Sequence, residues 1–254
     1  SGIGIGVLLA TLFLPHLDQI STRSAWLILS SFAFCICIVL SVLLQGFKPL
    51  LATQQTLSSS KSETDLLFFS LIAVYGCSAF AYVPHSLFWI DYLTKILKLD
   101  LFWMNFNWTL YGLGSALGAF TSYILAKKFG NFQALKILYS IYVFAIFIAI
   151  FSAHPIFTFM SSLLTGLLNP AVVFLTSYTI LQLYGTAYKK LWSIATILFA
   201  SVQLMGGLSF SALQHLGVSY HHQFLLAAFV LLLGTLQLFW VTRTKNIIQS
   251  SEYK

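Results

Sequence analysis

The sequence has very few charged residues. Only 7% of its 254 residues are charged, 59% are hydrophobic, and the mean hydropathy is +0.89. Because about a quarter of the residues in a typical soluble domain are charged, this composition excludes a soluble globular protein. The 13 Lys and Arg residues outnumber the 6 Asp and Glu residues but are too scattered to form a phosphate-binding surface. Nucleic acid is therefore not an expected partner.

Cysteines and catalytic motifs are also scarce. Three cysteines fall inside apolar runs and indicate no disulfide framework, namely Cys35, Cys37 and Cys77. The sequence contains no HExxH, GxSxG or Walker motif and no pair of intramembrane aspartates, which argues against an enzyme. Three histidines lie close together in an expected outer loop without Cys or carboxylate nearby, namely His215, His221 and His222. Neither a metal ion nor a cofactor is expected.

Long apolar runs are abundant. A hydrocarbon core of about 30 Å requires roughly 20 helical residues, because lipid offers no partner to unpaired backbone groups. Seven runs are long enough, namely residues 25–44, 66–90, 105–125, 137–153, 155–181, 191–213 and 224–241. An eighth run, 1–14, is shorter, and because the chain opens with Ser we interpret it as a truncated span. We predict an all-α integral membrane protein, a polytopic helical bundle with eight transmembrane helices.

Lys and Arg are unevenly distributed between the two expected sides of the membrane. One side holds ten, namely Lys48, Lys61, Lys127, Lys128, Lys136, Lys189, Lys190, Arg243, Lys245 and Lys254. The other side holds three, namely Arg23, Lys95 and Lys98. Since cytoplasmic loops carry the excess of positive charge, both termini are predicted to be cytoplasmic. The polar segment 46–65 is then a cytoplasmic linker, and 244–254 is a cytoplasmic tail.

Polar residues recur at helical spacing inside four of the spans. Such groups cost free energy in lipid unless they face protein or a water-filled cavity. The stripe in span 66–90 comprises Tyr75, Ser78, Tyr82, His85 and Trp89. The stripe in span 155–181 comprises Thr158, Ser162, Thr165, Asn169 and Thr176. The stripe in span 105–125 comprises Trp108, Tyr111, Ser115, Gly118 and Ser122. The stripe in span 191–213 comprises Ser193, Thr196, Ala200, Gln203 and Gly207. Spans 25–44, 137–153 and 224–241 lack a stripe and are expected to face lipid.

This order, in which every third span is peripheral, indicates stacked three-helix repeats around a shared polar cavity. The alternative is that small and hydroxylated residues only let helices pack closely. Gly114 and Gly118, or Gly2 and Gly6, have the GxxxG spacing that allows such packing. The sequence leaves both interpretations open.

The span order, the central linker and the peripheral third helices resemble the major facilitator superfamily of secondary transporters. More narrowly, three segments resemble its bacterial YbfB/YjiJ-type branch, namely Tyr75-Gly76 with Phe80 and Tyr82, Trp108 with the run Tyr111 to Ala116, and Gly2-Ile3-Gly4-Ile5-Gly6. The resemblance implies alternating access and a bacterial inner membrane. Residues 1–45 would be the last two helices of the first bundle, with the helices before them missing, and 66–243 the six-helix second bundle.

The resemblance also identifies a basic loop, with Lys127, Lys128 and Gly130 as its gating residues. This sequence departs from the family pattern there. Lys127 stands where an acidic residue is usual, and Asn131-Phe132 replaces a basic pair. The departure weakens the case for a charge-relay gate in this loop.

Two residues next to prolines carry the candidate chemistry. His85 follows Pro84, and a histidine can change its charge near physiological pH, so protons are a candidate coupling ion. The alternative is a neutral histidine bonded to a neighbouring helix. Asn169 precedes Pro170, so its amide and the carbonyl freed by the proline are available to a ligand or to cap a structural kink. Trp89 and Trp108 fit either a cavity wall or an interfacial aromatic belt.

We therefore predict transport of a small, neutral or amphipathic solute, with the lipid bilayer as the surrounding partner. The expected substrate contacts are Tyr75, Tyr82, His85, Trp108, Asn169 and Gln203. Two alternatives stay open. A membrane-embedded binding or assembly subunit would use the stripes as dry protein contacts, whereas an intramembrane enzyme would need a nucleophile, base or metal ligand set that the sequence lacks.

Overall fold

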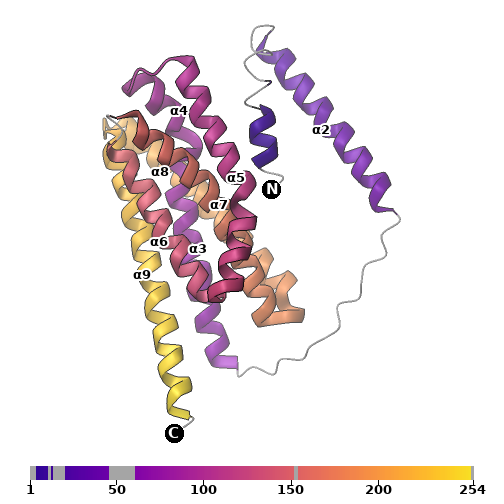
Figure 1. Ribbon diagram of the computed structural model, residues 1–254, viewed down its shortest axis with the longest axis vertical. Coiled ribbons are helices and arrows are strands. Elements are labelled where there is room, and N and C mark those ends of the chain that lie inside the picture. The colour runs from indigo at the N-terminus through magenta and orange to yellow at the C-terminus, as the bar shows by residue number, and fades with distance from the viewer. Residues whose placement is uncertain (1–3, 11–12, 14–20, 46–60, 152–153, 253–254) are drawn as a thin grey trace.

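The computed structural model describes residues 4–10, 13, 21–45, 61–151 and 154–252, and within them the chain is helical, with no strand. The helices run along a roughly common axis (Figure 1). They are α2 (Thr22–Leu44), α3 (Lys61–Val83), α4 (Trp89–Asp91), α5 (Leu101–Phe129), α6 (Asn131–Phe147), α7 (Pro155–Tyr184), α8 (Tyr188–His215) and α9 (Tyr220–Glu252). The all-helical expectation is confirmed for the described part of the chain.

Five stretches of the described residues are long and apolar enough to cross a membrane, namely Arg23–Leu44, Leu66–Ile96, Asn131–Phe151, Pro155–His215 and Tyr220–Arg243. The fourth stretch contains both α7 and α8. Helix α5 is 29 residues long but is not among them, since Asn, Tyr and Gly residues dilute its apolar content. A polytopic membrane fold agrees with these lengths, but the expected number of eight spans is not confirmed.

Local signals in the sequence set the helix ends. The carboxylate of Asp100 accepts a hydrogen bond from the Trp103 backbone amide at 3.1 Å and caps the start of α5. Gly130 separates α5 from α6 with φ of 78°, a left-handed conformation that glycine adopts without a steric penalty. Pro155 occupies the first turn of α7, where its missing amide hydrogen costs no helical bond. These signals produce sharp reversals between long helices.

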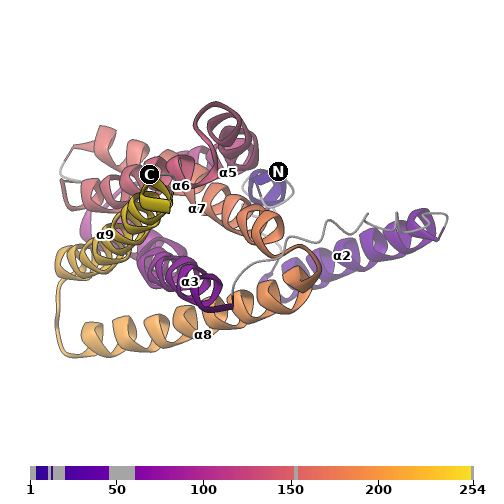
Figure 2. The same cartoon turned by 90° about the horizontal axis from the view of Figure 1, so that it is seen from below.

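Helices α3, α5, α6, α7 and α9 form one packed bundle, seen end-on in Figure 2. The tightest pair is α5 and α7, because glycines let the two backbones touch. A Cβ atom added at Gly114 would lie 2.3 Å from the Leu163 carbonyl oxygen, and one at Gly166 would lie 2.1 Å from the Tyr111 carbonyl oxygen. A Cβ atom at Gly118 would lie 2.5 Å from the Leu167 carbonyl oxygen, so the GxxxG packing interpretation is correct for both Gly114 and Gly118.

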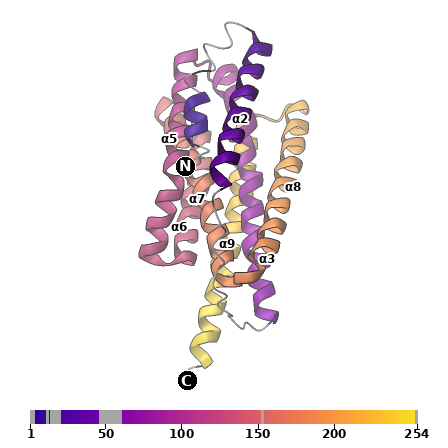
Figure 3. The same ribbon diagram turned by 90° about the vertical axis from the view of Figure 1, so that its right-hand side faces the viewer.

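Helix α8 packs mainly on α3, along one side of the bundle (Figure 3). Helix α2 stands apart, and its most apolar window has no residue buried in the structure. The short helical segment 4–10 lies against α5, where a Cβ atom at Gly4 would collide with the Ala116 backbone and one at Gly112 would touch Leu8. Gly6 has no such neighbour, and Gly2 lies outside the described residues. Among its described glycines, the segment thus uses Gly4 and not Gly6 for close packing.

The predicted boundaries differ from the structure in two places. The predicted linker 46–65 lies outside the described residues as far as residue 60, and from Lys61 onward it is already helix α3. At the other end, the predicted tail 244–254 is helical up to Glu252.

The expectation that span 137–153 only faces lipid is wrong for one face of α6. Tyr139 and Tyr142 are fully buried in the bundle core, whereas Ile141 and Phe144 on the opposite face are exposed. The prediction took the continuous apolar run from Val143 to Phe151 as typical of the whole span. One turn earlier, two tyrosines spaced three residues apart mark the buried face.

Candidate functional site

A hydroxyl pair lies near the middle of the bundle. The Tyr82 and Tyr111 hydroxyl oxygens, from α3 and α5, are 2.6 Å apart. The Trp108 ring stands edge-on to the Tyr111 ring, with centroids 5.2 Å apart and an interplanar angle of 85°. Tyr111 is buried, but Tyr82, Trp108 and Asn169 are only half-buried. This group, which we call the tyrosine rim, extends from a buried position to half-buried ones.

Asn169 of α7 completes the tyrosine rim, because its side chain lies beside the Tyr111 hydroxyl. Pro170 has no amide hydrogen, so the carbonyl of Gly166 one turn earlier loses its helical partner. The Ser115 hydroxyl of α5 replaces it and donates to that carbonyl at 3.1 Å. Asn169 is therefore not needed as a cap, and its enclosed Oδ1 atom has no hydrogen-bond partner among the described residues.

Two more enclosed groups without a partner lie deeper in the bundle. They are the Tyr142 hydroxyl of α6 and the Thr165 hydroxyl of α7, both on fully buried residues. The Tyr142 hydroxyl lies in the neighbourhood of the Tyr82 and Tyr111 hydroxyls. Thr165 stands one helical turn before Asn169. Buried polar groups in proteins are nearly always satisfied, so these atoms mark a place where water or a solute belongs.

His85 occupies a separate, fully enclosed position just after the tyrosine rim. It lies in a π-helical segment, Pro84–Phe88, that follows the proline. The Ser161 hydroxyl donates to the Ala145 carbonyl at 2.8 Å, so it must accept from His85 Nε2, also at 2.8 Å. That assignment fixes the proton on Nε2. Nδ1 is then an acceptor with no described partner.

The Trp89 side chain is buried and not part of an interfacial aromatic belt. Its indole Nε1 donates to Ser162 at 2.9 Å, Ser162 donates to Asn107 Oδ1 at 2.8 Å, and Asn107 donates to the Trp103 carbonyl at 2.9 Å. Each polar group in this chain has a partner. The Ser162 hydroxyl of the predicted stripe therefore fastens helices together, as the packing alternative proposed.

The structure separates two predicted contacts from the tyrosine rim. Tyr75 is buried against α8, with ring centroids 4.6 Å from Phe199 and 5.7 Å from Trp192. Gln203 is half-buried on α8 and forms no side-chain hydrogen bond with a described residue. Its stripe neighbours Ser193 and Thr196 are exposed and bond only to their own helix. The structure thus brings Tyr82, Trp108 and Asn169 together around Tyr111, whereas the sequence pattern did not separate Tyr75 from them.

Two groups beside the predicted contacts were missed. Ser161 lies one position from the predicted stripe residue Ser162, and Tyr142 lies in a span taken as peripheral. The sequence marks these two residues only weakly. Ser161 is a second serine next to Ser162, and Tyr142 is a tyrosine just before an apolar run.

The predicted gating loop lies at the lysine-rich end of the bundle. Lys127 and Lys128 are exposed in the last turn of α5, and the Lys128 ammonium lies 5.1 Å from the Phe129 ring centroid. Gly130 ends the helix with its amide donating to the Ala126 carbonyl at 2.9 Å. Within the described part of the chain, no ion pair involves either lysine.

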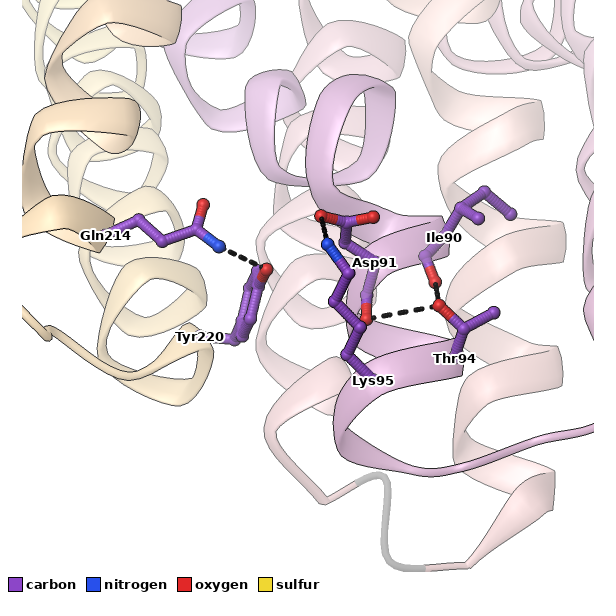
Figure 4. Close-up of polar contacts among 6 residues, drawn as sticks. All are labelled: Ile90, Asp91, Thr94, Lys95, Gln214 and Tyr220. Carbon is purple, nitrogen blue, oxygen red and sulfur yellow. Dashed lines mark hydrogen bonds and ion pairs between the residues drawn. The ribbon is translucent and has the colours of Figure 1, made fainter.

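The opposite end of the bundle is held by polar contacts shown in Figure 4. Asp91 and Lys95 form an exposed ion pair at 2.7 Å, and Gln214 of α8 donates to the Tyr220 hydroxyl. His222 bonds to Ser219 at 2.7 Å. Among the described residues, no three His, Cys, Asp or Glu side chains are grouped so that they could hold a metal ion.

The comparisons with known proteins agree with this architecture. The family model described as "Uncharacterised MFS-type transporter YbfB" matches residues 1–238. The curated proteins yielded no match. Because the family match covers nearly the whole chain, the protein belongs to the major facilitator superfamily of membrane transporters, in its YbfB-type branch.

Proposed function

We propose that this chain carries a small uncharged or amphipathic solute across the membrane by alternating access, with the tyrosine rim as its contact surface in the second bundle. The single observation that supports this most strongly is Asn169 Oδ1. It is an acceptor without a described partner, on a half-buried residue next to a hydroxyl pair. A solute that donates a hydrogen bond would satisfy it.

The chemistry of the tyrosine rim favours an uncharged solute. Tyr82, Tyr111 and Trp108 offer aromatic faces with polar tips, and Asn169 adds a neutral amide. None of these side chains carries a fixed charge. A charged solute would enter a region of low dielectric without a counter-ion, which costs much more free energy than burying a neutral one.

The domain arrangement is part of the same proposal. Residues 66–243 form the second six-helix bundle, and residues 1–45 end the first. The contact of segment 4–10 with α5 supports this division, because it is made by the small residues Gly4, Gly112 and Ala116. The lysine-rich end would face the cytoplasm of a bacterial cell, by the positive-inside rule.

Not every predicted contact enters this proposal in the same role. His85 is fully buried and bonded to Ser161, so it supports the helix interior behind the tyrosine rim. Coupling to protons stays a prediction. Tyr75 packs against α8, and Gln203 lies half-buried on α8. Their contact with solute also stays a prediction.

Ligand-dependent stability tests the proposed site. Purified full-length protein would be heated with a panel of neutral aromatic alcohols and amides, and a binder raises the unfolding temperature. Loss of one hydrogen bond to Asn169 weakens binding by about tenfold, so the Asn169→Ala variant should lose most of the shift. The matched control is Thr179→Ala, a buried α7 residue that bonds only to its own helix at Leu175.

Uptake into proteoliposomes then tests transport itself. The solute that stabilises the protein should accumulate inside vesicles that contain the wild type and the Thr179→Ala variant, but much less with Asn169→Ala. Equal uptake by all three would remove Asn169 from the site. A solute that binds but never enters the vesicles would support the alternative of a binding or assembly subunit.

A further inference from the structure

A cavity lies far from the tyrosine rim, at the lysine-rich end of the bundle. Its volume is about 300 Å³, within the range of small-ligand sites. It opens where α5 ends and α6 begins, next to Leu67 of α3 and Thr242 of α9. The lining residues are Leu67, Phe129, Gly130, Asn131, Phe132, Gln133, Lys136 and Thr242. We call this cavity the α6 cleft.

The α6 cleft combines apolar walls with one cation. Leu67, Phe129 and Phe132 supply carbon surface, and Lys136 is the charged residue of the lining. The Lys136 ammonium lies 5.3 Å from the Phe239 ring centroid, which holds it over an aromatic face. No described carboxylate pairs with it.

Two of the polar lining groups are already occupied. The Asn131 amide donates to Gln182 Oε1 at 2.7 Å, and the Thr242 hydroxyl donates to the Leu238 carbonyl at 2.8 Å. Gln133 is exposed, and none of its polar atoms bonds to a described side chain. Lys136 and Gln133 are therefore the groups free to bind a ligand, and both are hydrogen-bond donors.

The surroundings of the α6 cleft are positive. Lys127, Lys128 and Arg243 are exposed at the same end of the bundle. Asp91 and Asp100, the acids whose side chains the structure describes, lie at the other end, around the last turns after α3 and the start of α5. An anion at the α6 cleft would thus be attracted by several charges and repelled by none of the described ones.

We propose that the α6 cleft binds the phosphate group of an anionic phospholipid. Lys136 and Gln133 would contact the phosphate, while the acyl chains lie along Leu67 and Phe132. A free inorganic phosphate carries the same kind of negative charge but has no apolar part that could contact the apolar walls of the cleft. The lipid fits better because the cleft is at the end of apolar helices, where membrane headgroups are found.

Native mass spectrometry of the full-length protein tests this proposal. The wild type, titrated with phosphatidylglycerol or phosphatidylcholine in detergent, should retain the first lipid in preference to the second. Removing one lysine contact with an anionic lipid weakens retention by about fivefold, so K136Q should lose phosphatidylglycerol to that extent. The matched control is K190Q, an exposed lysine of α8 outside the cleft, which should behave as the wild type.

Each other outcome has a definite meaning. Equal loss in K136Q and K190Q would overturn the proposal, because general surface charge would then explain retention. Equal retention of the two lipids would overturn it as well. Calorimetric titration with inorganic phosphate should show no binding, and saturable binding abolished by K136Q would assign the cleft to a free anion instead. Asp65 precedes Leu67 by two positions in the sequence, so D65N should retain the lipid at least as well as the wild type.

Discussion

Single polar residues inside the bundle divide into those that complete a hydrogen bond between helices and those left without one. Ser115 bonds to Gly166 on α7, and Ser161 bonds to Ala145 on α6. Asn169 Oδ1, by contrast, is enclosed and unpaired. Because an unpaired buried group is costly, the first kind stabilises the bundle and the second kind is available for a ligand.

The Ser115→Ala variant tests the stabilising role. The Gly166 carbonyl would then lack both its helical partner, which Pro170 removes, and its replacement. We expect a loss of about 1–3 kcal/mol in the free energy of unfolding. The control is Thr109→Ala, because that hydroxyl bonds only to Asn105 in its own helix. Unfolding in detergent, followed by circular dichroism, would contradict this role if both variants had the same stability.

Sequence reasoning predicted these residues only in part. The pair Asn169 and Pro170 predicts a freed carbonyl, but which donor reaches it depends on α5 packing, which no local pattern encodes. His85 shows the same limit. Its stripe position predicts an inward direction, yet the acceptor Ser161 comes from a helix 76 positions away.

Among the helices, the pair α5 and α7 determines how closely the bundle packs. Gly114 and Gly166 bring the two backbones into contact, and the tyrosine rim lies between the same two helices and α3. Small shifts of α5 relative to α7 would therefore move Tyr111 relative to Asn169. Helix packing and the shape of the proposed site depend on the same glycines.

The Gly114→Ala variant tests this dependence. Its Cβ atom would lie 2.3 Å from the Leu163 carbonyl oxygen, so the helices must separate, at a cost of about 1–3 kcal/mol in stability. Gly76→Ala is the matched control, since its Cβ atom meets Val202 at 3.7 Å, an ordinary contact. We expect only the first variant to lower the unfolding temperature. Equal unfolding temperatures would show that α5 and α7 tolerate separation.

Helix positions were more predictable than helix faces. Apolar runs identify where helices lie, because only a helix satisfies its own backbone groups in lipid. Faces depend on partners, and α6 illustrates this, since Tyr139 and Tyr142 point inward from a helix predicted to be peripheral. After α3, the π-helical segment Pro84–Phe88 also changes the angular step that a regular helix would keep.

For the molecule as a whole, the stripes predicted to line one wet cavity are split between a packed interior and half-buried positions. Ser78 and Ser162 are fully buried and hydrogen-bonded, whereas Tyr82 and Asn169 are half-buried. The packing alternative therefore describes the first group. The cavity interpretation stays a proposal for the second.

Cysteine labelling in the full-length transporter separates the two groups. Single cysteines at positions 82 and 169 should react with a water-soluble maleimide, because both positions are only half-buried. A cysteine at position 162 should stay unreactive, since that side chain is buried between Trp89 of α4 and Asn107 of α5. The measurement is labelled fraction against time. Fast labelling at 162, or none at 82 and 169, would contradict the division.

The contact between segment 4–10 and α5 has a mechanical consequence. One side of α5 meets α7 through Gly114, and the other side meets the first segment through Gly112 and Ala116. The Gly4 and Ala116 backbones meet with no large side chain between them, whereas the Leu8 side chain is seated against Gly112. Any relative movement of segment 4–10 and α5 would therefore meet its main steric resistance at Leu8, and a smaller residue there would lower that resistance.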